Sequence, residues 1–400
     1  MLIRKLLKKD IERYAQMCCY CFHMKLDNAK KYIETGVEFG RGLIVEENHQ
    51  IMSAMFYYPF MENIRFQKMR MAGLSGVVTM PEARNKGFVL EQLKFIQKDM
   101  YDQGYPVSCL EPFKPPYYQK YGWCNASKRL KCKINIDDIR KFSKGSASGG
   151  NDKFEFVCME KPKVEIFKNI ECKFADLYNG CTYREKFFWE KNIFCQWDKE
   201  KQKFFYTIKK DGLEVAYIIF TLKEIPKSFS VDLNIQDFAY INYSGMQGIF
   251  AFAKEHRDQA KNIIISPPED FDIFHFAPSH FQDVKLISEL MFKVINIEKA
   301  LTQLKVRPDL KFDFMLDITD PISDKNSGKF AFRVADGKIT RIKNSQNIIK
   351  TDIRNFAILF IRRNSVKEIL DYGEVEISEN IIKSLNMMFP KENVYIKDWF

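Results

Sequence analysis

The spacing of apolar residues in the first 110 positions predicts alternating strands and helices. Ile3 to Lys5 is expected to form a short strand. Apolar residues then recur at helical spacing from Ile11 to Cys18, and Asp10 stands in the position that would cap this helix. A second helix is expected from Val89 to Met100, followed by a buried strand from Pro106 to Leu110.

Between these helices the pattern predicts three successive strands. They are expected at Gly42 to Glu46, Gln50 to Tyr58 and Met69 to Thr79, and the last two are joined by a polar, turn-like segment around residues 60–68. This order is typical of an antiparallel meander. The first part of the chain is therefore expected to build a mixed sheet covered by helices.

A break in composition follows at Lys141 to Lys153, which is rich in Gly and Ser. Beyond it, a strand pair is expected at Phe204 to Lys209 and Leu213 to Leu222, around Lys210-Asp211-Gly212. A strand from Asp237 to Tyr243 precedes a helix from Ser244 to Lys254. This order repeats that of the first domain weakly.

The last hundred residues predict a third, mixed domain that starts near residue 292. A helix is expected from Met291 to Leu304 and an alternating strand from Phe312 to Thr319. A hairpin is expected from Lys329 to Val334 and Lys338 to Ile342, with its turn at residues 335–337.

Composition excludes several classes of protein. With 46% hydrophobic and 29% charged residues among 400, the chain is neither disordered nor collagen-like. No stretch approaches the ~18 apolar residues of a membrane span, and the N-terminus has no secretory cleavage pattern. A cytoplasmic location is therefore expected.

The net charge of +11 is uneven, because residues 1–140 hold 23 basic and 15 acidic side chains, a surplus of +8. That surplus fits either a polyanionic ligand or a solvated basic surface. The ten cysteines lack paired CxxC spacing, and the five histidines form no metal-binding pair, so no metal is predicted. Cys109 is interpreted as a core residue.

The segment from Gly73 to Val89, GLSGVVTMPEARNKGFV, is the most informative. A strand with two glycines runs through a proline into Arg-x-x-Gly and then into a helix. Such a turn directs backbone N–H groups and a helix N-terminus at one spot, which suits a pyrophosphate. About thirty residues later, Tyr118 to Trp123, YQKYGW, follows the next expected strand.

Together these segments resemble the GNAT superfamily of acetyl-coenzyme A dependent N-acetyltransferases, and in particular its Eis-like group. The chain length, the weak repeat and the C-terminal Phe400 are also similar to that group. The resemblance implies an α/β (α+β) fold with two GNAT-type domains and a sterol-carrier-like domain. The expected limits are 1–140, a linker at 141–153, 154–291 without a cofactor motif, and 292–400.

The resemblance also assigns roles to residues. Acetyl-coenzyme A would be bound by the end of the third meander strand and by the turn that follows it, a set comprising Val77, Val78, Thr79, Arg84, Asn85, Lys86, Gly87, Phe88 and Val89. Tyr118 would protonate the departing thiolate, and the α-carboxylate of Phe400 would accept the amine proton. Physical chemistry agrees with these roles, since only an unprotonated amine attacks a thioester.

The implied acceptor is a primary amine of a polycation, such as an aminoglycoside or a lysine, acetylated directly in a ternary complex. Asp27, Asp398 and Trp399 are the candidate acceptor residues. A homo-hexamer is implied, and no nucleic acid partner is expected. Two departures from the family pattern bear on the cofactor: Val89 stands where Gly or Ala is common, and Asn85 replaces a basic residue.

Two other functions stay open at this point. A tandem-GNAT transferase that uses aminoacyl-tRNA could exploit the positive charge, although such enzymes lack a sterol-carrier-like domain. A non-catalytic lipid or small-molecule carrier would fit if Val89 and Asn85 mark a lost cofactor site. In an enzyme, the third domain is interpreted as a scaffold.

Overall fold

A computed structural model describes residues 1–140, 154–195, 202–279, 282–372 and 375–398. The expected linker at 141–153 lies outside these ranges. Contacts group the chain into two units, and each is described by itself. Unit 1 comprises Met1–Ser127, Asn179–Thr182 and Glu289–Phe400, and unit 2 comprises Lys128–Tyr178 and Tyr183–Ser288. These units differ from the limits expected at residues 140 and 291.

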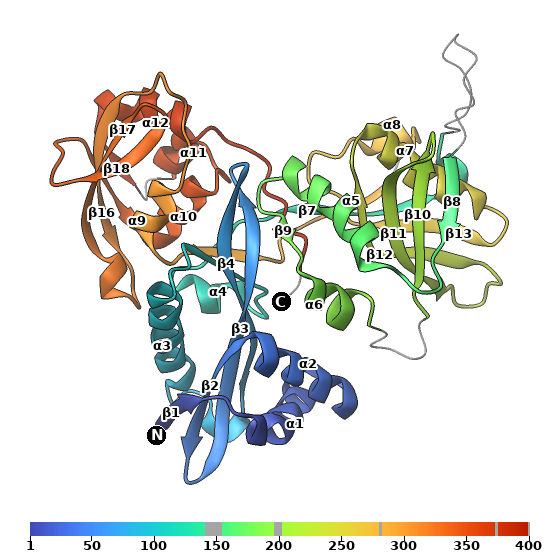
Figure 1. The fold of residues 1–400 in the computed structure, drawn as a ribbon, viewed down its shortest axis with the longest axis horizontal. Coiled ribbons are helices and arrows are strands. Elements are labelled where there is room, and N and C mark those ends of the chain that lie inside the picture. The colour runs from blue at the N-terminus through green and yellow to red at the C-terminus, as the bar shows by residue number, and fades with distance from the viewer. Residues whose placement is uncertain (141–153, 196–201, 280–281, 373–374, 399–400) are drawn as a thin grey trace. The chain divides into compact units, whose positions relative to one another are not determined.

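The first sheet of unit 1 has the strand order β1-β2-β3-β4-β5-β15-β6 (Figure 1). Strands β4 and β5 run parallel, and the other neighbours along this order are antiparallel. The expected meander is thus confirmed. The strands are β1 (Leu2–Lys5), β2 (Arg41–Glu47), β3 (Gln50–Ile64), β4 (Gln67–Thr79), β5 (Val107–Leu110), β6 (Cys124–Asn125) and β15 (Met291–Val294).

Helices cover both faces of this sheet. Tyr14 of α1 (Ile11–Phe22) and Tyr32 of α2 (Leu26–Phe39) contact the Phe56 ring, with centroids 6.1 and 5.4 Å away. The hydroxyl of Tyr57 instead donates to Asp99 of α3 (Phe88–Asp102) at 2.6 Å. Because neighbouring strand residues point to opposite faces, α1 and α2 lie on one face and α3 on the other.

The hairpin of β3 and β4 is longer than predicted. The turn lies within the expected segment 60–68 but is much shorter, because the strands continue to a two-residue turn at Arg65-Phe66, with φ of 54° and 63°. The polar residues suggested a turn, but Glu62, Asn63 and Arg65 are buried, and only Phe66 at the tip is exposed. The Arg65 guanidinium donates to the Met388 carbonyl at 2.5 Å, and the Asn63 amide donates to the Cys181 carbonyl at 2.7 Å.

The helix predicted from Met291 to Leu304 is also partly wrong. Met291–Val294 forms strand β15 between β5 and β6, and only Ile297–Thr302 is helical, as α9. All four strand residues are buried, and Lys293 among them finds polar partners inside the protein. The apolar run could not distinguish a buried strand from a helix by spacing alone.

The C-terminal part of unit 1 forms a sheet in the order β18-β17-β16-β19-β20, with buried Phe314, Leu316 and Phe332 in its core. The strand predicted at Phe312–Thr319 and the following hairpin are confirmed. The remaining elements are β16 (Phe312–Thr319), β17 (Gly328–Ala335), β18 (Lys338–Ile342), β19 (Ile348–Asp352), β20 (Glu376–Ile377), α10 (Ile353–Phe360), α11 (Val366–Asp371) and α12 (Ile382–Met388).

Unit 2 forms a second mixed sheet in the order β14-β7-β13-β12-β11-β10-β8. Its β7 was expected in the first domain but pairs with β13 and β14, and nothing in composition marks a boundary at residue 128. The elements are β7 (Arg129–Asn135), β8 (Phe154–Cys158), β9 (Thr182–Tyr183), which begins at the last residue of unit 1, β10 (Phe204–Lys210), β11 (Leu213–Glu224), β12 (Val231–Tyr240), β13 (Ala260–Ile265), β14 (Asp283–Ile287), α5 (Val164–Leu177), α6 (Lys186–Phe188), α7 (Tyr243–Glu255) and α8 (Ile273–Phe276).

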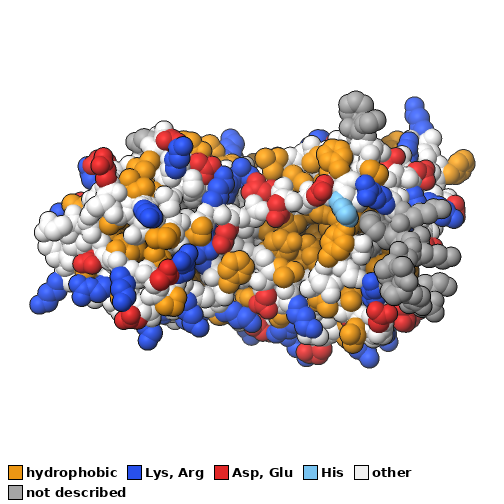
Figure 2. Space-filling model, turned by 90° about the horizontal axis from the view of Figure 1, so that it is seen from above, with side chains coloured by type: hydrophobic (Ala, Val, Ile, Leu, Met, Phe, Trp, Pro, Cys, Tyr) orange, Lys and Arg blue, Asp and Glu red, His pale blue; other side chains and the backbone are white. Residues whose placement is uncertain are grey.

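Surface charge is mixed. On the face drawn in Figure 2, basic side chains are interspersed with acidic and apolar ones and do not form one continuous patch. In the described part of the chain, none of the helices is both long and apolar enough to cross a membrane.

Candidate functional site

Strands β4 and β5 separate at the carboxyl end of the first sheet. Their pairing ends at Leu74 and Leu110, whereas β4 continues to Thr79. The register between β3 and β4 shifts here, so that β4 bulges at Gly76, where φ is +64°. The Tyr14 hydroxyl donates to the Gly76 carbonyl at 2.5 Å. A side chain at Gly76 would collide with that hydroxyl, so this bulge requires glycine.

The bulge sets the direction of the last β4 residues. Val78 is buried, whereas Val77 and Thr79 are partly exposed. Beyond Leu110, the described structure has no β5 residue paired with this end of β4. On the β5 side, the last residues of β4 are therefore unpaired in the described structure, although they still pair with β3. These are residues that the resemblance assigns to the cofactor arm.

The turn after β4 leads directly into α3. Gly87 occupies the N-cap position with φ of +80°, and no side chain among the described residues caps the helix. A Cβ built on Gly87 would meet nothing within 4 Å. The space beside Gly87 is therefore open, and no described side chain caps the first turn of α3. Uncapped N–H groups at a helix N-terminus favour anions. A pyrophosphate fits this turn.

The two cations of the turn differ. Arg84 is exposed, and its Nε donates to the Thr79 carbonyl at 3.4 Å. The Lys86 ammonium lies 2.8 Å from the Glu47 carboxylate, so part of its charge is already balanced. Asn85 adopts φ of 63°, a conformation that asparagine tolerates better than most residues, which accounts for this departure from the family pattern.

Tyr118 lies on the short helix α4 (Pro115–Gln119), directly after β5. It is buried in a hydrophobic cluster against which Val77 and Val89 also pack, so the structure brings the proposed acid to both parts of the proposed cofactor site. Its ring contacts Tyr117 and Trp123 edge-on. Burial, and then the neighbouring Tyr117, raise the pKa of Tyr118 above its ordinary value.

The opposite face of the sheet carries a buried carboxyl group that the sequence did not reveal. Glu62 is fully buried on β3, and the Cys109 thiol donates to its carboxylate oxygens at 3.5 and 3.7 Å. Burial raises the pKa of Glu62 to about 8, and the charge of Asp398 adds to the rise. The prediction that Cys109 is a core residue is confirmed, and burial raises its pKa well above the usual range.

The polar residues around Glu62 suggested a turn, so the sequence did not identify Glu62 as a buried strand residue. A signal was nonetheless present, because Phe56, Tyr58, Phe60 and Glu62 alternate along one strand face. Of the candidate acceptor residues, Asp398 is buried and accepts a hydrogen bond from the Thr182 hydroxyl. Asp27 is exposed in the first turn of α2, and in the described structure it is not joined to this cluster.

The C-terminal segment packs against the rest of unit 1 up to residue 398, the last described residue. Tyr395 and Ile396 are buried, as their apolar character predicts. The Tyr395 amide donates to the Asn179 carbonyl at 2.8 Å, and the Ile396 amide donates to the Ser127 hydroxyl at 3.0 Å. Trp399 and Phe400 lie outside the described residues.

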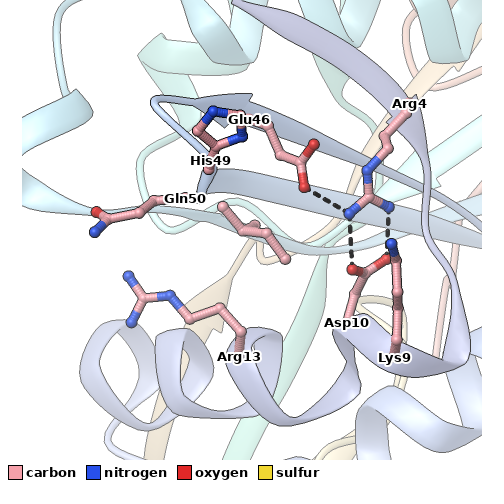
Figure 3. Close-up of a pocket in the computed structure, with 8 residues that line it drawn as sticks. Arg4, Lys9, Asp10, Arg13, Glu46, His49 and Gln50 are labelled. Atoms are coloured by element: carbon pink, nitrogen blue, oxygen red, sulfur yellow. Dashed lines mark hydrogen bonds and ion pairs between the residues drawn. The ribbon is translucent and has the colours of Figure 1, made fainter.

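One open cavity of about 440 Å³ lies elsewhere, between β1, β2 and the start of α1 (Figure 3). Arg4 points between Asp10 and Glu46 and lies 2.7 Å from each carboxylate. Asp10 holds the N-cap position of α1, but its carboxylate binds Arg4 instead, so the predicted cap is wrong. The residues predicted to bind cofactor do not line this cavity.

Comparison with protein families shows which family this chain resembles in each part. Residues 2–126 and 180–291 each match an acetyltransferase (GNAT) domain, and residues 297–397 match a sterol carrier protein domain. The two GNAT matches together span more than half of the chain. The chain belongs to the GNAT N-acetyltransferases. Its tandem GNAT domains and its sterol carrier domain give it the Eis-like architecture that the sequence predicted.

Solved structures match this GNAT protein over its full length. A GCN5-related N-acetyltransferase from Anabaena variabilis has 21% identity and a TM-score of 0.88, with all of both chains covered. A probable N-acyltransferase of unknown function from Enterococcus faecalis has 18% identity and a TM-score of 0.89, covering 100% of this chain and 99% of its own. Eis1 from Mycobacterium abscessus has 14% identity and a TM-score of 0.80, again with both chains fully covered.

These structural likenesses establish the fold. A search of curated protein sequences finds no significant match.

Proposed function

We propose that this protein transfers the acetyl group of acetyl-coenzyme A to a primary amine of a polycationic acceptor. The observation that carries the proposal is the uncapped N-terminus of α3 at Gly87, next to the end of β4 that is unpaired on its β5 side. The N–H groups of that helix end would hold the pyrophosphate, with Arg84 nearby, and the edge of Val77 and Thr79 would hold the pantetheine arm.

Acetyl-coenzyme A supplies an activated thioester, and the chain's own residues handle the protons. The amine nitrogen attacks the carbonyl carbon, the C–S bond breaks, and the sulfur takes a proton from the Tyr118 hydroxyl. The raised pKa keeps Tyr118 protonated at neutral pH, as an acid must be. The α-carboxylate of Phe400 stays the expected acceptor of the amine proton.

A cationic acceptor, aminoglycoside-like or a lysine amine, is supported by the buried carboxyl group of Asp398, close to the end of the described chain. Acidic groups at low exposure attract ammonium groups more strongly than they do in water. By resemblance we also propose a homo-hexamer, which light scattering of the purified protein would test.

Replacement of Tyr118 by Phe tests the chemistry. The variant keeps the ring and its packing, so we expect coenzyme A to bind as before while kcat falls by roughly 10²-fold or more, the usual contribution of a general acid. Thiol release with a panel of aminoglycosides measures turnover, and calorimetry measures binding. Unchanged turnover with intact binding would remove Tyr118 from the mechanism.

A further inference from the structure

Lys293 places a fully buried ammonium group at the centre of unit 1. It lies on β15, between β5 and β6, and its Nζ donates to three acceptors. These are Asp320 Oδ1 at 2.9 Å, Gln97 Oε1 at 2.9 Å and the Tyr121 carbonyl at 2.6 Å. An ammonium has three protons, so these three partners account for all of them.

The three partners belong to three parts of the molecule. Gln97 lies on α3, the helix whose N-terminus faces the proposed pyrophosphate. Asp320 follows β16 in the sterol carrier domain, and Gln97 Nε2 also donates to its second oxygen at 3.0 Å. Tyr121 lies just beyond α4, which carries Tyr118. The network thus ties the sterol carrier domain to the helices of the proposed cofactor site and acid.

Two short paths lead from Lys293 to Tyr118. The Tyr121 amide donates to the Tyr118 carbonyl at 3.0 Å, so the residue held by Lys293 closes the turn that begins at the acid. The Lys293 ammonium also lies 4.8 Å from the centre of the Trp123 ring. Trp123 packs edge-on against the Tyr118 ring at 6.3 Å. The same cation therefore fixes both the backbone and the packing partner of Tyr118.

Stability alone is a poor reason for such a group. Burial lowers the pKa of Lys293 to about 8, although Asp320 opposes the change, so the site disfavours its charge. Replacing a buried ion pair by apolar residues of similar volume is often neutral or stabilising. A buried charge that stability does not require points to a role that an apolar side chain such as leucine could not fill.

We propose that Lys293 is a positioning residue for Tyr118, and that Asp320 thereby makes the sterol carrier domain part of the acetyl-transfer apparatus. The ammonium fixes the carboxyl end of α4, so that the phenol stays aligned with the leaving sulfur. This inference rests on the proposed function of Tyr118. Misplacement of a catalytic group by about 1 Å can cost about 10²-fold in rate.

The decisive variant is the double replacement Lys293→Met/Asp320→Leu. It removes both buried charges and the bond to the Tyr121 carbonyl. It also takes an acceptor away from the Ile322 amide and from the side chains of Gln97 and Asn326, which costs some stability. We expect a lower melting temperature than that of the parent chain, but an unchanged dissociation constant for coenzyme A when it is measured well below that temperature. We expect kcat with an aminoglycoside acceptor to fall by about tenfold or more, together with faster amide hydrogen exchange at residues 117–123.

A matched control lies in unit 2. Arg184 and Asp237 form another buried ion pair, with 2.6 Å between Nη1 and Oδ2. The double replacement Arg184→Met/Asp237→Leu makes the same kind of change in the unit that does not contain α4. It is expected to leave kcat and the hydrogen exchange of residues 117–123 unchanged.

The outcomes separate this inference from the proposed function. If Lys293→Met/Asp320→Leu keeps the parent kcat while Tyr118→Phe loses activity, the positioning role is refuted and the acid role stands. If Tyr118→Phe keeps its activity, both fall. A loss of coenzyme A binding as large as the loss of kcat would also refute the inference, because the effect would then pass through α3.

A milder variant decides the matter if the double variant does not fold. Asp320→Asn keeps the shape of the side chain but removes the negative charge that pairs with the Lys293 ammonium. The proposal predicts a smaller fall in kcat, unchanged coenzyme A binding and faster exchange at residues 117–123. Parent values for both kcat and exchange would overturn it.

Discussion

The two GNAT domains place the same elements in the same order but end them differently. In the first, the long strand β4 leads through a turn into α3 and the parallel strand β5; in the second, β12 leads into α7 and β13. The N-cap residue of α3 is Gly87, which has no side chain to cap the helix and has open space where a Cβ would lie. At α7 the Asn242 side chain accepts from the Gly245 amide at 3.0 Å and caps the helix.

The space in front of the two helices also differs. A Cβ on Gly245 would lie 2.2 Å from the Val215 carbonyl, so α7 begins in direct contact with β11. The end of β12 carries Phe238 and Tyr240, whose rings pack on Phe174 of α5 with centroids 6.0 and 5.0 Å away. In the second domain, the Asn242 cap and the aromatic rings of β12 therefore occupy the region that the first domain leaves open for an anion.

The two domains also differ in how their buried carboxyl groups are paired. Asp237 of the second domain accepts from Arg184 at 2.6 Å and from the Tyr217 hydroxyl at 2.9 Å. Glu62 of the first domain is bonded to a thiol, a weak donor, at 3.5 Å. Removing the partner of a paired buried carboxylate is strongly destabilising, whereas a poorly paired buried carboxyl group is costly to keep and is typical of functional sites.

The largest effect is expected at Glu62. Its pKa is raised from 4.5 to about 8 in the folded state, so between these values the folded protein binds more protons than the unfolded chain. The free energy of unfolding therefore falls as pH rises from about 4.5 to about 8, by at most about 5 kcal/mol. Glu62→Gln should be more stable than the parent at pH 8 and similar to it at pH 4, as measured by urea unfolding.

Asp237→Asn is the matching variant in the second domain. Because it leaves the buried Arg184 without its carboxylate, it should destabilise the protein at pH 8, opposite in sign to Glu62→Gln. Equal and parallel effects of the two variants would remove this contrast between the domains.

A smaller effect is expected at the turn before α3. Gly87→Asp places a negative charge where the pyrophosphate is proposed to bind, and should weaken coenzyme A binding by about 100-fold. Gly212→Asp is the matched control, because Gly212 also has positive φ, +78°, and nothing within 4 Å of its Cβ. Both variants carry the same backbone strain, so calorimetry should separate them. Similar affinities would argue against this turn as the cofactor site.

The smallest effect is expected at the cap of α7. Asn242→Ala removes the bond to the Gly245 amide, and should lower stability by about 1 kcal/mol. Coenzyme A binding should not change, since this helix end is packed against β11. A second binding event gained by this variant would contradict the interpretation of the second domain as closed.

The sequence predicted the parts of this account that depend on local pattern. The turn at Gly87, the helix α3 and the position of Tyr118 after β5 follow from glycine placement and apolar spacing. The hairpin turn at Asp211-Gly212 followed from turn chemistry in the same way.

Local pattern failed where burial by distant segments decides the structure. Glu62 and Asn63 look like turn residues, and only their contacts across the chain keep them in a buried strand. Met291–Val294 became a strand because β5 and β6 flank it. The partners of Lys293 are 27 to 196 residues away, a separation that no spacing rule covers.

The stoichiometry of acetyl-coenzyme A binding shows whether the first GNAT domain alone binds the cofactor. Calorimetric titration of the intact chain should give one site per chain, since the first domain alone leaves its helix N-terminus open. Two sites per chain would show that the cap and rings of the second domain do not close it. No binding at all would contradict the proposed cofactor site, and with it the proposed acetyl transfer.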